Sequence, residues 1–266
     1  MPRIATALAG LALLTACASA PPISPQARSE LAPSGKIRVA INFGNRNFAR
    51  KDAAGEPGGV AVELARELER RSGIPVELVA YESAGRLTGA AKSGVWDVAF
   101  LAYAQAREKE IAFPATFAEL DSTYLVPAGS ALRNAEEVDR EGVRIAVSAK
   151  GGNDLFLTRL LKHAKLVRVP STPTSNALKV FVAEKLDAYA GLKPSLIADA
   201  AKLPGYRVLD GRYTVIRYSI GIVQGRDAGA RYLRDFIEDT KASGLLARLI
   251  EKNGVQGVSP APPASR

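Results

Sequence analysis

Apolar positions in the first part of the chain repeat with two different periods. Residues 36–41 and 75–80 are short runs rich in β-branched side chains, as is typical of strands. Between them, apolar residues recur about every fourth position over 60–72, which predicts an amphipathic helix. A short helix is expected at 85–92, and the almost wholly apolar run 97–102 predicts a strand buried on both faces. The order of these segments predicts a βαβαβ unit with a parallel sheet.

The same pattern starts again in the second half of the chain and predicts another such unit. Strands are expected at 123–127, 143–147, 166–169, 186–190 and 218–223. Helices are expected at 151–163, 175–184 and 195–202, and two more over 229–253 with a break near Gly244. The chain is therefore predicted to be an α/β protein with two lobes of similar make.

The ends of the predicted strands position the candidate binding residues. Ligands of open parallel sheets bind beyond the carboxyl ends of the strands. The first and third strands bring Asn42 and the segment 102–107 to one place, and the turn 148–153 is the matching strand end in the second lobe. Arg107 is the cation that this segment delivers, although taken alone it also fits a solvated helix start.

Composition narrows the chemistry that the chain can perform. The 266 residues carry a net charge of +9, but basic and acidic residues are mixed and aromatic residues make up only 6%, so nucleic-acid binding is not expected. One cysteine and one histidine cannot build a Cys/His zinc site, and no Walker or GxGxxG loop follows a strand. Neither a metal nor a cofactor is expected. His163 is interpreted as a solvated residue at a helix end.

The N-terminus has the pattern of an export signal. A basic residue precedes a short apolar run and then small residues, which is typical of a secretory signal peptide over 1–20. Cys17 follows Leu-Thr-Ala, which resembles a bacterial lipobox. In that interpretation the signal is 1–16 and Cys17 is lipidated, whereas the alternative is cleavage after Ala20. Both alternatives export the chain to the periplasm or the cell surface.

Several segments, in their order and spacing, resemble the family 3 extracellular solute-binding proteins, the polar-amino-acid receptors of ABC importers. The segments are KIRVAI from 36, GGVAVELARELERRSGIPVELV from 58, GVWD ending at Asp97, Arg107 with IAFP ending at Pro114, GVRIAVSAKGG from 142, VAEKLDA from 182 and YSIGI from 218. This resemblance covers nearly all of 36–253. It implies a two-lobed, type II periplasmic binding protein-like fold, in which each lobe is a mostly parallel sheet flanked by helices.

The resemblance also implies that the first lobe is discontinuous in sequence. It comprises 36–117 and 219–255, whereas 118–218 form the second lobe with the hinge strands. Residues 21–35, rich in Pro, Ser and Ala, are expected to be a linker, and 256–266 a disordered tail.

In proteins of this family an arginine at the position of Arg107 clamps the ligand carboxylate, because its planar fork matches a carboxylate. Backbone N–H groups at the Gly-rich helix start of the second lobe would add an anion site. The ligand-binding candidates are therefore Arg107, Asn42, Asn45, Ala102, Ser148, Gly151, Gly152 and Asn153. A simple strand–helix turn remains an alternative for the glycines, and loop chemistry for Asn45.

The sequence departs from the family where the ligand ammonium would bind. The Asp that usually takes the ammonium aligns near Leu192, and Asn42 replaces the Asp of the first strand. The loop that leads to Arg107 is also shorter. Asp154 could accept an ammonium, but helix N-capping explains it equally well. The expected ligand is therefore an anionic or zwitterionic solute, either an amino acid or an organic acid.

The function that the resemblance implies is a monomeric receptor that delivers a small solute to an ABC permease of the inner membrane. Hinge closure about strands near 117–124 and 214–218 would enclose the solute. One alternative is a periplasmic dehydratase-type enzyme, for which Glu82, Glu119 and Lys150 are the possible acid or base groups. The other alternative is a sensor lipoprotein that uses the same lobes without transport.

Overall fold

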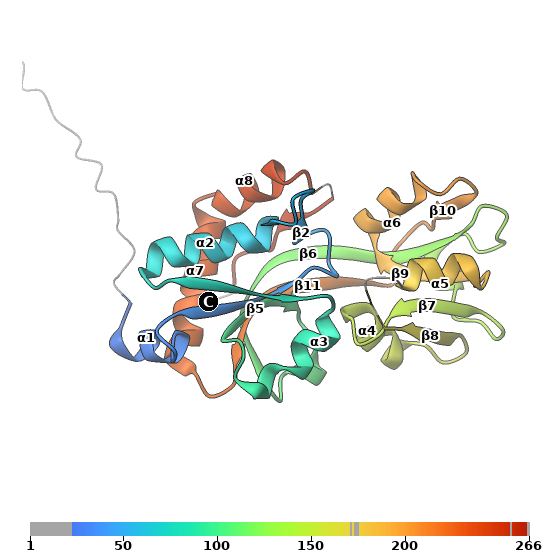
Figure 1. Cartoon of the computed structure of the whole chain (residues 1–266). Helices are drawn as coiled ribbons and strands as arrows, with labels where there is room; N and C mark the ends of the chain where they lie inside the picture. Colours follow the sequence, from blue (N-terminus) through green and yellow to red (C-terminus); the bar gives the residue numbers. More distant parts are fainter. Residues whose placement is uncertain (1–22, 171, 173–175, 256, 265–266) are drawn as a thin grey trace, which may run out of the picture.

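The computed structural model describes residues 23–170, 172, 176–255 and 257–264. The predicted signal sequence and Cys17 lie outside these residues. Two α/β lobes lie side by side, and two long strands run from one lobe to the other (Figure 1). The strands of both lobes belong to one sheet, whose order is β4-β1-β5-β11-β6-β9-β7-β8.

The first lobe is built on three parallel strands. Strand β1 (Ile37–Asn42) lies between β4 (Val76–Tyr81) and β5 (Val98–Ala102). Successive side chains of a strand point to opposite faces, and so Phe100 and Leu101 belong to two different cores. All residues of β5 are buried, as the apolar run predicted.

Helices cover both faces of this sheet. They are α2 (Val60–Ser72), α7 (Asp227–Ala242) and α8 (Leu245–Lys252) on the face of Phe100, and α3 (Ala84–Gly89) with the 3-10 turn η1 (Ala91–Ser93) on the face of Leu101. A small hairpin of β2 (Arg50–Lys51) and β3 (Pro57–Gly58) precedes α2. The apolar stripe predicted over 60–72 is confirmed, and Gly73 ends that helix in the left-handed conformation at φ 62°.

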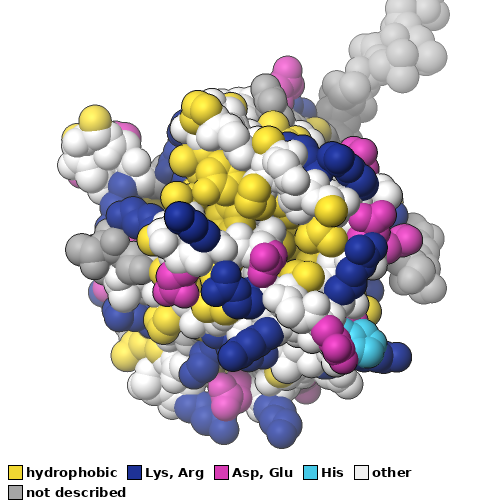
Figure 2. All heavy atoms as spheres, turned by 90° about the vertical axis from the view of Figure 1, so that its right-hand side faces the viewer, with side chains coloured by type: hydrophobic (Ala, Val, Ile, Leu, Met, Phe, Trp, Pro, Cys, Tyr) yellow, Lys and Arg dark blue, Asp and Glu magenta, His cyan; other side chains and the backbone are white. Residues whose placement is uncertain are grey.

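The second lobe repeats the arrangement. Its strand β7 (Arg144–Ser148) lies parallel to β8 (Lys165–Val169) and β9 (Ala188–Leu192). Its other elements are α4 (Gly152–Leu160), α5 (Ala177–Ala183), α6 (Lys193–Ala200), the edge strand β10 (Tyr206–Val208) and the 3-10 turn η3 (Ala135–Glu137). The helix predicted over 151–163 ends at Leu160. His163 therefore lies beyond it, on the exposed surface at this end of the molecule (Figure 2).

Two long antiparallel strands join the lobes. Strand β11 (Thr214–Val223) pairs along its whole length with residues 111–122 of strand β6 (Ile111–Pro127). The register shifts between Tyr218 and Ser219 and again between Ile220 and Ile222, in the part of β11 that also pairs with β5 of the first lobe. Such irregularities bend a strand pair. The first of them begins at Tyr218, the end of the segment 214–218 in which a hinge was predicted, and the second lies outside both predicted hinge segments.

The two segments expected to lack structure are ordered in this fold. Within the expected linker, α1 (Pro25–Leu31) begins at Pro25, a position that tolerates proline, and the Ser24 hydroxyl caps it. Leu31 is buried in the first core. Within the expected tail, β12 (Ser259–Pro260) pairs with β6. The linker and tail predictions were therefore wrong for these residues.

A buried carboxylate holds the base of the first lobe together. Asp97, at the start of β5, is 0% exposed and accepts from Arg38 Nε at 2.8 Å and Arg226 Nη1 at 2.8 Å. The Arg38 backbone N–H donates to the same carboxylate. Hydrogen bonding to Asp97 raises the pKa of Arg38 above its usual range. Because every charge here has a partner, Asp97 has a structural role.

Candidate functional site

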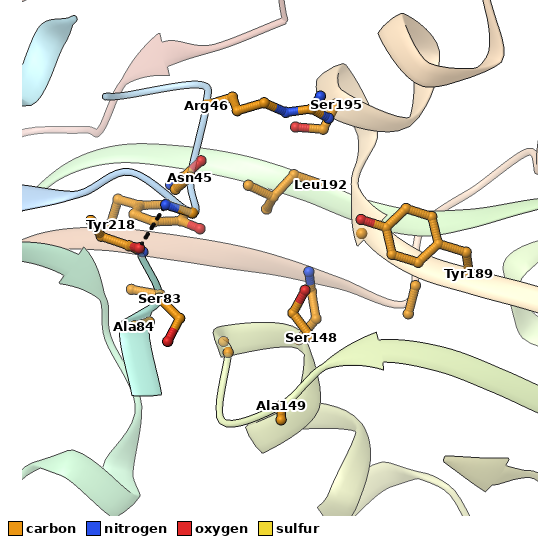
Figure 3. A pocket seen from close by; sticks show the side chains of 18 residues that line it. Asn45, Arg46, Ser83, Ala84, Ser148, Ala149, Tyr189, Leu192, Ser195 and Tyr218 are labelled. Carbon is orange, nitrogen blue, oxygen red and sulfur yellow. Dashed lines mark hydrogen bonds between the residues drawn. The ribbon is translucent and has the colours of Figure 1, made fainter. Parts of the chain in front are cut away.

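A cavity of about 120 Å³ lies between the two lobes, at the carboxyl ends of their strands (Figure 3). Both lobes contribute to its wall. The lining residues are Asn42, Gly44, Asn45, Arg46, Ser83, Ala84, Ala102 and Tyr218 from one side, and Ser148, Ala149, Gly151, Gly152, Asn153, Tyr189, Ala190, Gly191, Leu192 and Ser195 from the other. The position agrees with the strand-end rule used in the prediction.

All the predicted binding residues except Arg107 line this cavity. Ala102 forms part of its wall at the end of β5, and the turn between β7 and α4 faces it from the second lobe. A Cβ added to Gly152 would lie 3.0 Å from the Ala102 Cβ, so the two lobes approach closely here. Parallel-sheet geometry therefore brought these segments together as predicted.

Arg107 lies behind the cavity wall. Its side chain is 2% exposed, and its guanidinium donates to the Ala102 carbonyl and, at 2.9 Å, to the Lys150 carbonyl of the second lobe. Its Nε has no hydrogen-bond partner, and no described carboxylate forms an ion pair with it. Burial lowers the pKa of Arg107 to about 10, so the group still carries its charge at neutral pH. In this arrangement the direct clamp expected of Arg107 is absent, and the residue places a buried positive charge beneath the cavity.

The start of α4 faces the cavity from the second lobe. The first N–H groups of a helix have no intrahelical acceptor, and the helix dipole makes this end positive. Gly152 and Asn153 both line the cavity here, and the buried Asn153 Oδ1 has no hydrogen-bond partner. Nearby, Asp154 is occupied, because it accepts from the Lys150 N–H at 2.7 Å and from Arg168 Nε at 2.8 Å. Asp154 therefore stabilises the turn and does not reach the cavity.

The asparagines on the first-lobe side partly organise their own loop. The Asn42 Oδ1 accepts from the Gly44 N–H at 3.0 Å. The Asn45 Oδ1 accepts from the side-chain amide of Asn47 at 3.1 Å. Both asparagines also line the cavity. Each therefore stabilises its own loop and at the same time lies where a ligand would bind.

Direct contacts hold the lobes in a closed arrangement. Arg46 Nη2 lies 2.8 Å and 3.1 Å from the two carboxylate oxygens of Asp199 in α6. Asn47 donates from its side-chain amide to the Ser195 hydroxyl at 2.8 Å. These contacts join residues roughly 150 positions apart in the chain, and they lie at the mouth of the cavity beside Ser195 and Arg46 (Figure 3).

Sequence reasoning missed several lining residues. Among them are Arg46, Ser83, Tyr189 and Ser195. Tyr189 is the second residue of β9. Burial raises the pKa of the Tyr189 hydroxyl to about 12. The hydroxyl therefore stays protonated at neutral pH and can donate a hydrogen bond. The position of Ser83 just after β4 could have been inferred from the strand-end rule, whereas Arg46 and Ser195 come from different lobes and line one cavity because of how the lobes are placed.

The described part of the chain has no group of three or more His, Cys, Asp or Glu residues that could hold a metal ion. Within the same residues, every helix is too short or too polar to cross a membrane.

Residues 37–256 match the bacterial extracellular solute-binding proteins, family 3. The chain therefore belongs to this family, and it has the type II periplasmic binding protein fold, as the sequence predicted. None of the curated proteins matches the chain.

Solved structures support the fold over most of the chain. A mutant of ArgBP from T. maritima is 22% identical, covers 86% of this chain and 100% of its own, and has a TM-score of 0.73. The solute receptor for L-cysteine of Neisseria gonorrhoeae is 20% identical, with 87% and 94% covered and a TM-score of 0.74. The ancestral amino acid-binding protein AncCDT-1, a precursor of cyclohexadienyl dehydratase, is 23% identical, with 84% and 97% covered and a TM-score of 0.71.

Proposed function

We propose that this chain is an extracytoplasmic receptor that binds a small carboxylate-bearing solute between its lobes and delivers it to an ABC permease. The observation that carries the proposal is the cavity at the strand ends, which both lobes line and which the start of α4 faces. Family membership supports export and solute binding. Similar structures include an arginine-bound ArgBP and a receptor for L-cysteine, and both of these solutes bear a carboxylate.

Binding and closure follow from the arrangement of charges. In an open state the contact between Arg107 and the Lys150 carbonyl is broken, and one edge of the guanidinium is free for an incoming anion. Bending of the β6–β11 pair where it passes from one lobe to the other then brings α4 and α6 onto the solute. The ion pair between Arg46 and Asp199 joins the lobes and holds the closed form that a permease would recognise.

Attachment to the membrane through a lipid on Cys17, and a monomeric state, belong to the same proposal. Cys17 in its lipobox-like setting supports the first of these. Incorporation of a labelled fatty acid in cells, which Cys17→Ala should abolish, tests the attachment. Labelling that persists in the variant would contradict it.

The dehydratase alternative has less support, which comes from the similarity to AncCDT-1, a precursor of cyclohexadienyl dehydratase. Among the described lining residues there is no Glu, Asp, Lys or His that could transfer a proton. Glu119, one of the candidates for that role, lies on the strand that pairs with β12 and does not line the cavity.

A thermal-shift and calorimetry panel tests the receptor proposal. The panel should contain amino acids and organic acids, each with its methyl ester as a matched control that lacks the carboxylate. A bound carboxylate is expected to raise the unfolding midpoint by mass action, and its ester is expected to have no effect. If no carboxylate raises the midpoint, or if esters bind as well as acids, the proposal is wrong.

A further inference from the structure

The cavity carries positive but no negative charge among its described lining residues. Arg46 is the charged side chain in its wall, and neither Asp nor Glu lines it. The nearest carboxylates are engaged elsewhere. Asp154 is 4% exposed and bonded to Arg168, while Asp199 is 4% exposed and bonded through both oxygens to Arg46.

The neutral acceptors in the wall carry no negative charge that could balance an ammonium group. The Oδ1 atoms of Asn42 and Asn45 each accept one hydrogen bond from their own loop, and the hydroxyls of Ser148 and Tyr189 are uncharged. The Asn153 Oδ1 is without a partner, but it belongs to the first turn of α4, where the helix dipole is positive. An ammonium group placed here would give up its hydration and would meet an amide in a positive field.

Two positive groups near the cavity, the Arg107 guanidinium and the N-terminus of α4, favour an anion over an ammonium group. The buried guanidinium of Arg107 has carbonyl partners but no counter-ion among the described residues. The α4 N-terminus approaches the same point, since Gly152 lies against Ala102, whose carbonyl Arg107 contacts. Two independent positive sources therefore converge on one wall of the cavity.

The cavity is also small. Its volume of about 120 Å³ is below the ~300–1,000 Å³ that is usual for pockets of drug-sized ligands. It is closed on one side by Leu192, an apolar side chain that is 8% exposed. The solute therefore has few atoms beyond its carboxylate.

We infer that the solute is a small organic anion without an ammonium group, such as a 2-hydroxy or 2-oxo carboxylate, and not an α-amino acid. The inference rests on the proposed receptor function and narrows its substrate class. A hydroxyl or oxo group at the second carbon needs only a neutral partner, and the hydroxyl of Tyr189 or Ser148 can supply one.

Calorimetry with matched ligand pairs tests the inference. Each pair shares one carbon skeleton: glycolate with glycine, L-lactate and pyruvate with L-alanine, and the 2-hydroxy and 2-oxo analogues of valine with L-valine. The hydroxy or oxo acid should bind at least tenfold more tightly than the amino acid of the same skeleton. Equal or tighter binding of the amino acids would overturn the inference and leave the receptor proposal intact, whereas failure of every carboxylate would overturn both.

A designed reversal gives a second, independent readout. Leu192 is the N-cap of α6, a position that favours both Asp and Asn. Leu192→Asp adds a carboxylate to the wall, while Leu192→Asn is the neutral control of the same shape. The Asp variant should raise amino-acid affinity relative to hydroxy-acid affinity by at least tenfold, and the Asn variant should not. If both variants change the ratio equally, charge does not set the ligand class and the inference is wrong.

Discussion

The two ends of strand β5 hold buried charge in opposite ways. At its start, the Asp97 carboxylate is paired with two arginines, Arg38 and Arg226. Beyond its end, Arg107 is buried to a similar degree but contacts only carbonyl oxygens, and its Nε has no partner. Both groups are therefore removed from water, but among the described residues only Asp97 has an opposite charge beside it.

This difference indicates that the charge at the start of β5 serves stability, whereas the charge beyond its end serves ligand binding. A buried charge that lacks a partner is costly, and it persists only where something else uses it. The start of β5 packs against the elements that build the lobe, whereas its end meets the cavity between lobes. The comparison predicts that substitutions at Asp97 affect folding and that substitutions at Arg107 affect binding.

The largest effect is expected for Asp97→Asn. This change leaves Arg38 and Arg226 without their counter-ion at a buried site, and breaking a buried pair costs about 3–5 kcal/mol. Urea unfolding should show this loss of unfolding free energy. The control is Asp121→Asn, which removes an exposed pair with Arg212 and should cost about 0–1 kcal/mol. If the two variants lost equal amounts of unfolding free energy, the buried Asp97 would not have the structural role that the comparison with Arg107 assigns to it.

An intermediate effect, of another kind, is expected for Arg107→Met. Methionine fills a similar volume without charge, so the unfolding free energy without ligand should stay the same or rise. Affinity for the bound carboxylate should fall about 30-fold, or about 2 kcal/mol, because the anion loses a buried positive charge. Calorimetry and unfolding measure the two quantities separately. Full affinity together with a large loss of stability would assign Arg107 a structural role like that of Asp97.

The smallest effect is expected for Asp199→Asn. It removes the charge that holds Arg46 across the cavity mouth, and Arg46 is itself 61% exposed, so the cost should be only about 1 kcal/mol. The closed form should become less populated, which small-angle X-ray scattering measures as a larger radius of gyration. An unchanged radius, with unchanged ligand affinity, would mean that this pair does not contribute to closure.

Much of the fold was predictable because local signals agreed with the final structure. The helix over 60–72 has an apolar stripe and a glycine at its end, and its predicted bounds hold. The residue pattern predicted strand β6 over 123–127 and the family resemblance added a hinge strand near 117–124, whereas 111–116 was missed because Pro114 interrupts the pattern. Helix α1 was hidden because a proline-rich segment is typical of linkers, although Pro25 stands where helices accept it.

The candidate site divides in the same way. Strand ends such as Asn42 and Ser148 were predictable because parallel strands present their carboxyl ends at one edge. The contact of Arg46 with Asp199 was not, because it depends on how far the lobes close. The placement of Arg107 behind Ala102 depends on a short 3-10 turn, η2 (Gln105–Arg107), which composition and periodicity do not reveal.

The position of strand β12 makes it a suitable place to monitor the motion of the lobes. Strand β12 pairs with β6 at Glu119 and Ala118, within the strand that joins the lobes, and Gly257 just before it lies near Pro194 of α6. The Lys241 ammonium holds the following segment through the Pro262 carbonyl. A fluorophore attached close to this end would therefore sit where the lobes turn and could report solute capture as a change in emission. For the same reason, a bulky affinity tag at this end would hinder the movement of the two lobes. A purification tag should therefore be placed elsewhere on the molecule.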